Sequence, residues 1–216
     1  MRTIVLIVFV IALTRVTNSA PVSDAELKNL LAAIRQNRST QADFQEQRVI
    51  RLMKNPVQSS GTVSFHPPNK FRREVKGNSP SITVSDGRNL WIYYPNFKSV
   101  ERYPLGKGSP LDATVAAINS ALNLENIETS FNISATKSDN GHELALLPRT
   151  AAMKRVFQKL DLRINDKFRV ERTDMLLPNG DRIVTTYSNQ TRSPISPSTF
   201  EFKPPSGTEV TTPLGQ

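Results

Sequence analysis

Few side chains in this sequence are spaced so that they could do acid–base or metal chemistry. Both histidines stand in predicted turns: His66 precedes Pro67-Pro68, and His142 follows a glycine. A metal site needs several converging ligands, and no His, Asp or Glu group has ligand-like spacing. The chain has no cysteine, no G-x-S-x-G elbow and no glycine-rich phosphate loop. We therefore expect both histidines to be surface residues, and we expect no metal or cofactor.

Two carboxylate pairs are the remaining candidates for catalysis. Asp161 with Asp166, or Asp174 with Asp181, would suit glycoside hydrolysis if the fold placed an acid opposite a base. Each of these residues also fits a solvated charge on a strand face or in a turn, which is the interpretation we favour. The sequence therefore predicts a protein that is not an enzyme.

The first 19 residues have the layout of a secretory signal peptide. A basic start at Arg2 precedes an unbroken apolar run from Ile4 to Leu13, which Arg15 ends. That run is too short to span a bilayer, and Ser19 offers a suitable cleavage site. An uncleaved membrane anchor is the alternative. The rest, residues 20–216, is expected to be a single domain.

The composition is basic, with 28 Lys and Arg against 19 Asp and Glu and a net charge of +9. Such a balance favours anionic partners such as lipid headgroups or acidic proteins. The basic residues are scattered, so we interpret them mostly as a solvated surface. A signal peptide argues against a nucleic-acid partner.

Two amphipathic helices are predicted, over 24–36 and 110–122. Ser23 and Glu26 form a capping box before the first, and Ser109 with Pro110 suits the start of the second. Each helix repeats apolar residues at helical spacing on one side. These stripes are Leu27, Leu30, Leu31 and Ile34 in the first helix and Leu111, Val115, Ile118 and Leu122 in the second.

Elsewhere the pattern has period two and is divided by turn residues, which favours an antiparallel meander. A large twisted sheet must curl, and one-sided helices must cover an apolar surface. We therefore predict a mainly β fold with some α (α+β): an incomplete antiparallel β-barrel of about 11 strands, with a helical lid over a hydrophobic cavity. The expected strands are 41–53, 61–65, 71–75, 82–85, 90–94, 100–105, 127–136, 143–147, 156–164, 168–173, 182–187 and 199–202.

The predicted hairpin at Asp86-Gly87 carries the chain's one tryptophan, Trp91. Tyr93, Phe97 and Tyr103 stand nearby, around the hairpin and in the next strand. Two interpretations stay open for these aromatic residues. They are core residues, or they form a wall that contacts acyl chains.

Four segments, in this order after a signal peptide, resemble the LolA family of periplasmic lipoprotein carriers. The match spans nearly the whole mature chain. The segments are Ala42-Asp43-Phe44-Gln45, Gly61 to Phe65 followed by Pro68-Asn69-Lys70-Phe71-Arg72, Val84 to Tyr93 (VSDGRNLWIY), and Phe200 to Gly207 (FEFKPPSG).

The resemblance implies a monomeric periplasmic protein that binds the acyl chains of lipoproteins in its cavity. It implies receipt of the acylated lipoprotein from an inner-membrane ABC release complex (LolCDE-like) and delivery to a LolB-like outer-membrane acceptor. Other relatives of the fold carry glycolipids or sense envelope stress. A carrier of another acylated lipid or glycolipid, or a lipid-sensing regulator, is therefore the alternative function.

The resemblance also suggests which residues meet the cargo. Phe71 and Trp91 match family positions linked to binding and to the cavity. With the helix stripes and the aromatic hairpin, the expected cargo-binding residues are Phe71, Trp91, Tyr93, Leu30, Leu111, Val115 and Ile118. The family arginine that holds the lid falls on Pro67 here, and proline has no donor. Arg72 and Arg73 are the candidates to control the lid in its place.

Overall fold

A computed structural model describes residues 20–37, 40–66, 69–105 and 127–213. These residues form one sheet of 13 strands in the order β1-β8-β9-β10-β11-β12-β2-β3-β4-β5-β6-β7-β13. Neighbouring strands are antiparallel except for the last pair, in which β13 runs parallel to β7. The sheet does not close on itself, so the incomplete antiparallel barrel predicted from the sequence is confirmed.

Eleven of the twelve expected segments contribute strands, β2 to β12, and two very short strands, one near each end of the chain, add to the edges of the sheet. The strands are β1 (Ala20–Pro21), β2 (Gln41–Val49), β3 (Val57–His66), β4 (Lys70–Lys76), β5 (Ser81–Ser85), β6 (Asn89–Tyr94), β7 (Ser99–Pro104), β8 (Phe131–Ser138), β9 (Gly141–Pro148), β10 (Lys159–Asn165), β11 (Val170–Leu176), β12 (Arg182–Thr191) and β13 (Glu209–Thr211). The helices are α1 (Asp24–Asn37), α3 (Ile127–Ser130) and α4 (Ala151–Lys154), with 3₁₀ turns η1 (Pro95–Phe97) and η2 (Pro197–Phe200).

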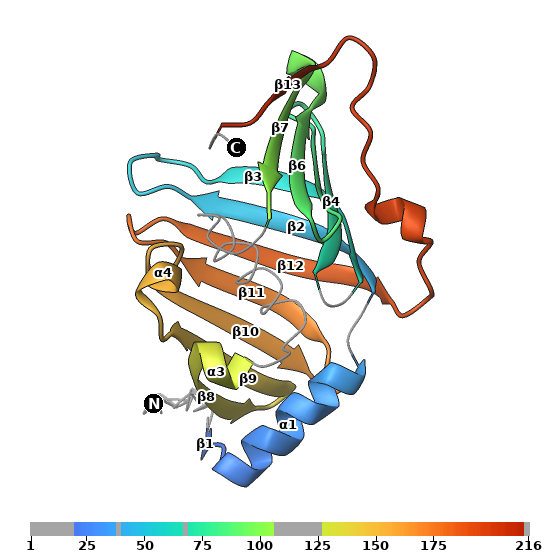
Figure 1. The fold of residues 1–216 in the computed structure, drawn as a ribbon. Helices are drawn as coiled ribbons and strands as arrows, with labels where there is room; N and C mark the ends of the chain where they lie inside the picture. Colours follow the sequence, from blue (N-terminus) through green and yellow to red (C-terminus); the bar gives the residue numbers. More distant parts are fainter. Residues whose placement is uncertain (1–19, 38–39, 67–68, 106–126, 214–216) are drawn as a thin grey trace, which may run out of the picture.

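The sheet bends sharply, so that it has two arms (Figure 1). Strands β8 to β12 form the first arm, and strands β4 to β7 form the second arm, which stands steeply across it. Strands β2 and β3 join the two. At this junction a Cβ added to Gly61 would lie 1.7 Å from the carbonyl oxygen of Glu74. Only glycine lets the β3 and β4 backbones approach so closely.

Alternation along β10 defines the two faces of the sheet. Leu160, Leu162 and Ile164 are buried on the face that we call inner, while Asp161 and Arg163 point to the opposite, outer face. The strand interpretation of this segment is thereby confirmed. Because strands are paired in register, each partner of an inner residue is also inner, which fixes the face of every paired residue.

Helix α1 packs on the inner face of the first arm. The predicted capping box is present: Ser23 N donates to Glu26 Oε2 at 3.0 Å, and Glu26 N donates to Ser23 Oγ at 3.4 Å. Arg35 near the end of α1 also pairs with Glu128 of α3 at 2.8 Å. The main hydrophobic core lies between α1 and strands β8 to β10. It is formed by Leu30, Leu31, Ile34, Ile127, Phe131, Ala135, Leu144, Leu146, Met153, Phe157, Leu160, Leu162 and Ile164.

Two expected strand segments are helical turns. Residues 127–130 form α3, because Ile127 and Phe131, one helical turn apart, both insert into the main core. Residues 197–200 form η2, which Pro197 begins and which ends in the buried Phe200. The predicted helix 110–122 lies outside the described residues. No helix among the described residues is long and apolar enough to cross a bilayer.

Candidate functional site

The inner face of the second arm carries a small apolar cluster. Phe71 of β4 lies opposite Phe65 of β3, and Leu90 of β6 is two strands away on the same face. All three side chains are at most 5% exposed. Partly buried Ile92, Tyr103 and Leu105 pack around them. We call these six residues the second-arm cluster. It is separate from the main core, so this arm has apolar surface of its own.

Trp91 and Tyr93 lie on the other face of the same arm. Ser85, the partner of Phe71, pairs with Leu90, whereas Val84 pairs with Trp91. Trp91 and Tyr93 therefore point to the outer face, opposite to Phe71. On the outer face both rings contact Phe202 of the C-terminal segment, with centroids 5.7 and 5.9 Å apart. The structure therefore does not bring Trp91 and Tyr93 together with Phe71.

The C-terminal segment crosses the outer face of the second arm (Figure 1). Phe200 is 1% exposed and meets the ring of His66 edge-on at 5.9 Å. Arg72 Nη1 donates to the carbonyl oxygen of Thr199 at 3.5 Å. Together with the Phe202 contacts, these interactions fix the segment against β4 to β6.

The helix-borne site residues are only partly described. Leu30 of α1 is 4% exposed and belongs to the main core, so it packs on the first arm and not on the second-arm cluster. Leu111, Val115 and Ile118 lie outside the described residues, and so does Pro67. The structure therefore places Phe71 and Leu30 on the same face, within different apolar clusters.

The two neighbouring arginines of β4 point to opposite faces. Arg72 is outer and pairs with Glu74 at 2.5 Å. Arg73 is inner, and its Nη2 donates to Glu46 Oε2 of β2 at 2.9 Å. Its guanidinium carbon also lies 4.3 Å from the ring centroid of Phe44. The sequence did not single out Glu46, because its partner lies 27 residues away and no local spacing signals the pair.

A second polar group lies on the inner face at β6 and β7. Tyr103 donates its hydroxyl to Glu101 Oε2 at 2.8 Å. Burial and this carboxylate raise the pKa of Tyr103 to about 12. Burial and the same carboxylate also raise the pKa of Tyr94. Both tyrosines therefore remain neutral hydrogen-bond donors, and the inner face of the second arm is mixed in polarity.

The two histidines lie in different places. His66 is exposed, whereas His142 is half-buried and stacks on Phe168 at 6.4 Å. His142 borders a hollow of ≈ 370 Å³ beside α1, and its buried Nδ1 has no hydrogen-bond partner. Burial, with the charge of Lys137, lowers the pKa of His142. The expectation of a surface position is therefore wrong for His142, because its ring fills space between β9 and Phe168. Within the described ranges, no group of three or more His, Asp or Glu is placed to hold a metal ion.

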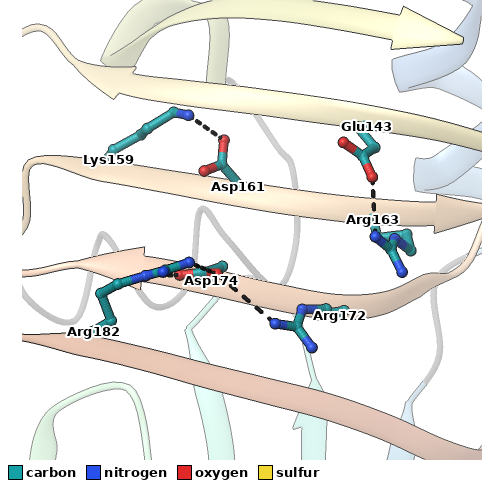
Figure 2. Close-up of polar contacts among 7 residues, drawn as sticks. All are labelled: Glu143, Lys159, Asp161, Arg163, Arg172, Asp174 and Arg182. Atoms are coloured by element: carbon teal, nitrogen blue, oxygen red, sulfur yellow. Dashed lines mark hydrogen bonds and ion pairs between the residues drawn. The ribbon is translucent and has the colours of Figure 1, made fainter. Parts of the chain in front are cut away.

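The outer face of the first arm is charged (Figure 2). Asp161 of β10 lies directly opposite Asp174 of β11. Asp161 pairs with Lys159 at 2.9 Å, and Asp174 pairs with Arg172 at 3.9 Å and with Arg182. The Asp161 side chain is 43% exposed, which agrees with the interpretation as a solvated strand-face charge. The Asp174 side chain is only 16% exposed. Asp181 is buried, accepts a hydrogen bond from Arg51 N at 3.1 Å and lies 3.8 Å from Arg48, so the interpretation as a solvated charge is wrong for Asp181. A shallow hollow of ≈ 610 Å³ lies over this surface.

Comparisons with known proteins agree with this architecture. Among solved structures, an uncharacterized conserved protein from Thermus thermophilus aligns with a TM-score of 0.52 at 16% identity, over 86% of this chain and 98% of its own. That likeness concerns the fold alone.

Sequence relatives are more specific. The outer-membrane lipoprotein carrier protein of Dechloromonas aromatica is 28% identical over 181 residues, which are 82% of this chain and 83% of that protein. The protein of the same name from Coxiella burnetii is 26% identical over 209 residues, 94% of this chain and 93% of its own. A family model described as outer membrane lipoprotein carrier protein LolA matches residues 35–203. Since this match covers well over half of the chain, the protein belongs to the LolA family.

Proposed function

We propose that this protein is a periplasmic carrier that binds the acyl chains of lipoproteins and shuttles them from the inner to the outer membrane. The observation that carries the proposal is the second-arm cluster around Phe71, on the inner face of an open sheet in a LolA-family chain. We place the acyl chains on this surface. Phe71 is the residue that we expect to contact them directly.

The physical requirement is a balance between burial and release. Burial of each CH₂ group is favourable by about 0.8 kcal/mol, so the exposure of several acyl chains to water is strongly unfavourable. A carrier must therefore offer comparable apolar surface, and it must also return the cargo. The second-arm cluster meets both needs better than the main core, because it is separate from that core and can be uncovered without unfolding it.

We further propose that the two helices act as a lid. Leu30 in α1, and Leu111, Val115 and Ile118 in the predicted helix 110–122, carry the apolar stripes that cargo would displace. Arg73, on the inner face, is better placed than the outer Arg72 to influence such a movement. Residues 1–19 would direct export as a cleaved signal peptide, and residues 20–216 would form the single carrier domain.

The partners that follow from this role are an acylated lipoprotein, an inner-membrane ABC release complex of the LolCDE type and a LolB-like outer-membrane acceptor. We expect the protein to act as a monomer. Binding and transfer need no chemical step by the protein, so we propose that it is not an enzyme.

The test is binding of a synthetic triacylated lipopeptide to the purified mature chain. Phe71→Glu should weaken binding at least tenfold, because a carboxylate would replace the centre of the second-arm cluster. Phe97→Glu is the matched control, since Phe97 is 80% exposed and lies outside the cluster. Phe71→Ala, with a smaller loss, serves if Phe71→Glu does not fold. Equal binding by the wild type and both Phe71 variants would refute the proposal.

Mass spectrometry of lipids and peptides that co-purify from the periplasm identifies the natural cargo. Acylated N-terminal peptides support the lipoprotein carrier. A glycolipid as the dominant species would instead support the alternative cargo on the same surface.

A further inference from the structure

We propose that Arg73 and Glu46 form a site for the ester carbonyl oxygens of a glycerol-linked acyl chain. We call this pair the carbonyl site. The inference rests on the proposed function, because it assigns the place where the polar end of the bound acyl chains lies. It also makes the cargo class narrower: an ester-linked acylglycerol group is favoured over a simple hydrocarbon or a phosphate-bearing head.

Glu46 is held in place from three neighbouring strands. Its Oε2 atom accepts hydrogen bonds from Arg73 of β4 at 2.9 Å and from Thr185 of β12 at 3.3 Å. Its Oε1 atom accepts from Ser59 Oγ of β3 at 3.5 Å. The Phe44 ring supports the guanidinium group from one side, 4.3 Å from its carbon. Both partners of the ion pair are therefore positioned before any ligand arrives.

Arg73 keeps donors available for a ligand. A guanidinium group has five N–H donors, and in the described part of the chain Arg73 donates a hydrogen bond only through Nη2, to Glu46. Its side chain is 29% exposed and that of Glu46 is 22% exposed. The pair is thus largely removed from water but still reachable from the inner face. A ligand oxygen at this position would accept hydrogen bonds from guanidinium N–H groups that donate to no other residue in the described ranges.

The carbonyl site lies beside the second-arm cluster. Arg73 and Phe71 are two residues apart on β4 and point to the same face, about 7 Å apart along the strand. Across the sheet, Arg73 pairs with Thr83, and Thr83 pairs with Ile92 of the cluster. An acyl chain packed on Phe71 and Ile92 therefore brings its carbonyl end within reach of the guanidinium group.

The net charge of the Arg73–Glu46 pair favours a neutral ester carbonyl oxygen over a charged phosphate oxygen as the ligand. Arg73 and Glu46 together carry no net charge, so the site does not attract an anion as an isolated arginine would. A phosphate at the guanidinium group would also lie close to the Glu46 carboxylate and be repelled by it. A neutral ester carbonyl accepts the hydrogen bond without that repulsion. The site therefore fits the ester linkage of the chains better than a charged headgroup.

The experiment compares two lipids that differ only in the carbonyl groups. Dioctanoylglycerol has two ester carbonyls, and its dioctyl ether analogue has none. We expect the wild-type mature chain to bind the ester roughly tenfold more tightly, as a hydrogen bond from a charged donor would give. Arg73→Met should bind both lipids with similar affinity. Glu46→Gln/Arg73→Met, which removes both charges, gives the same readout if the single variant does not fold.

Arg72→Met is the matched control, because Arg72 is the next residue of β4 and has an ion pair of its own on the outer face. It should keep the wild-type preference for the ester. The inference is overturned if the wild type binds ester and ether equally, or if Arg73→Met keeps the preference. It is also overturned if dioctanoyl phosphatidic acid binds much more tightly than dioctanoylglycerol. In each of these cases acyl binding itself survives, and the proposed function stands. If no acyl lipid binds at all, both proposals fail.

Discussion

The indole ring of Trp91 lies against the ring of Phe202, with the two centroids 5.7 Å apart. This contact joins the hairpin strand β6 to the C-terminal segment across the outer face of the sheet. It also gives Trp91 an environment that depends on a residue 111 positions later in the chain. The hairpin and the tail therefore stabilise each other.

Removing this contact should loosen the tail. We expect Phe202→Ala to lower the free energy of unfolding by about 1–2 kcal/mol, because a half-buried aromatic side chain that touches two other rings is lost. Trp91 is the chain's one tryptophan, so its fluorescence should shift toward longer wavelength in the native state. Urea denaturation followed by fluorescence measures both effects. Phe97→Ala is the control and should change neither, because Phe97 is 80% exposed.

Gly61 should be essential for the bend between the arms. A Cβ at this position would lie 1.7 Å from the Glu74 carbonyl oxygen and 3.1 Å from the Phe44 ring. We expect Gly61→Ala to cost about 3 kcal/mol, at the upper end of overpacking effects, because a backbone atom cannot move aside as a side chain can. Chemical denaturation provides the measurement. Ser60→Ala, one residue away and exposed, should cost little; equal losses in both variants would contradict the close-approach argument.

His142 should make stability depend on pH. Lys137 and Glu26 are the charged groups that act on it, and burial is the main cause of its lowered pKa. Because the folded state binds the proton less well than the unfolded state, stability is fully present above pH 6.5, the ordinary value, and falls as pH drops through the folded pKa. His142→Phe should flatten this dependence between pH 7 and 5, as measured by thermal unfolding. His66→Gln should leave the His142 contribution intact, and an unchanged slope in His142→Phe would refute the assignment.

The phenol of Tyr103 should ionise at a higher pH than an ordinary tyrosine. Burial and Glu101 raise its folded pKa to about 12 from 10.0, so its contribution to stability is present below pH 10 and is lost as pH rises through 12. Glu101→Gln removes the neighbouring charge and should move the tyrosinate absorbance step of Tyr103 to lower pH. Tyr103→Phe identifies the step by abolishing it. A titration curve that Glu101→Gln leaves unchanged would show that the carboxylate has no influence.

Local sequence patterns predicted most of the sheet correctly, because a strand with one buried face alternates apolar and polar residues. Leu160, Leu162 and Ile164 alternate with charged residues, so both the strand and its inner side were readable. In β6 the apolar character is continuous from Leu90 to Tyr94, and no alternation tells which side faces inward. In the structure both faces carry apolar contacts: Leu90 and Ile92 belong to the second-arm cluster on the inner face, and Trp91 and Tyr93 contact Phe202 on the outer face.

The candidate site shows the same limit. Phe71 was singled out through a sequence motif, and the structure places it in the second-arm cluster. The Arg73–Glu46 pair depends on the register between β2, β3 and β4, which no short motif encodes. The strands β1 and β13 have two and three residues, so they exist only through pairing with β8 and β7.

The two short strands β1 and β13 affect how the edges of the open sheet can associate with other chains. An unclosed barrel exposes two borders of unpaired N–H and C=O groups, and such borders invite other chains to join and polymerise. Here each edge of the sheet ends in a strand of only two or three residues, which gives an added strand few backbone groups to pair with. The strand next to β8 ends in Pro21, which has no N–H donor. The two short strands therefore reduce the length of regular edge that each border of the open sheet offers to another chain.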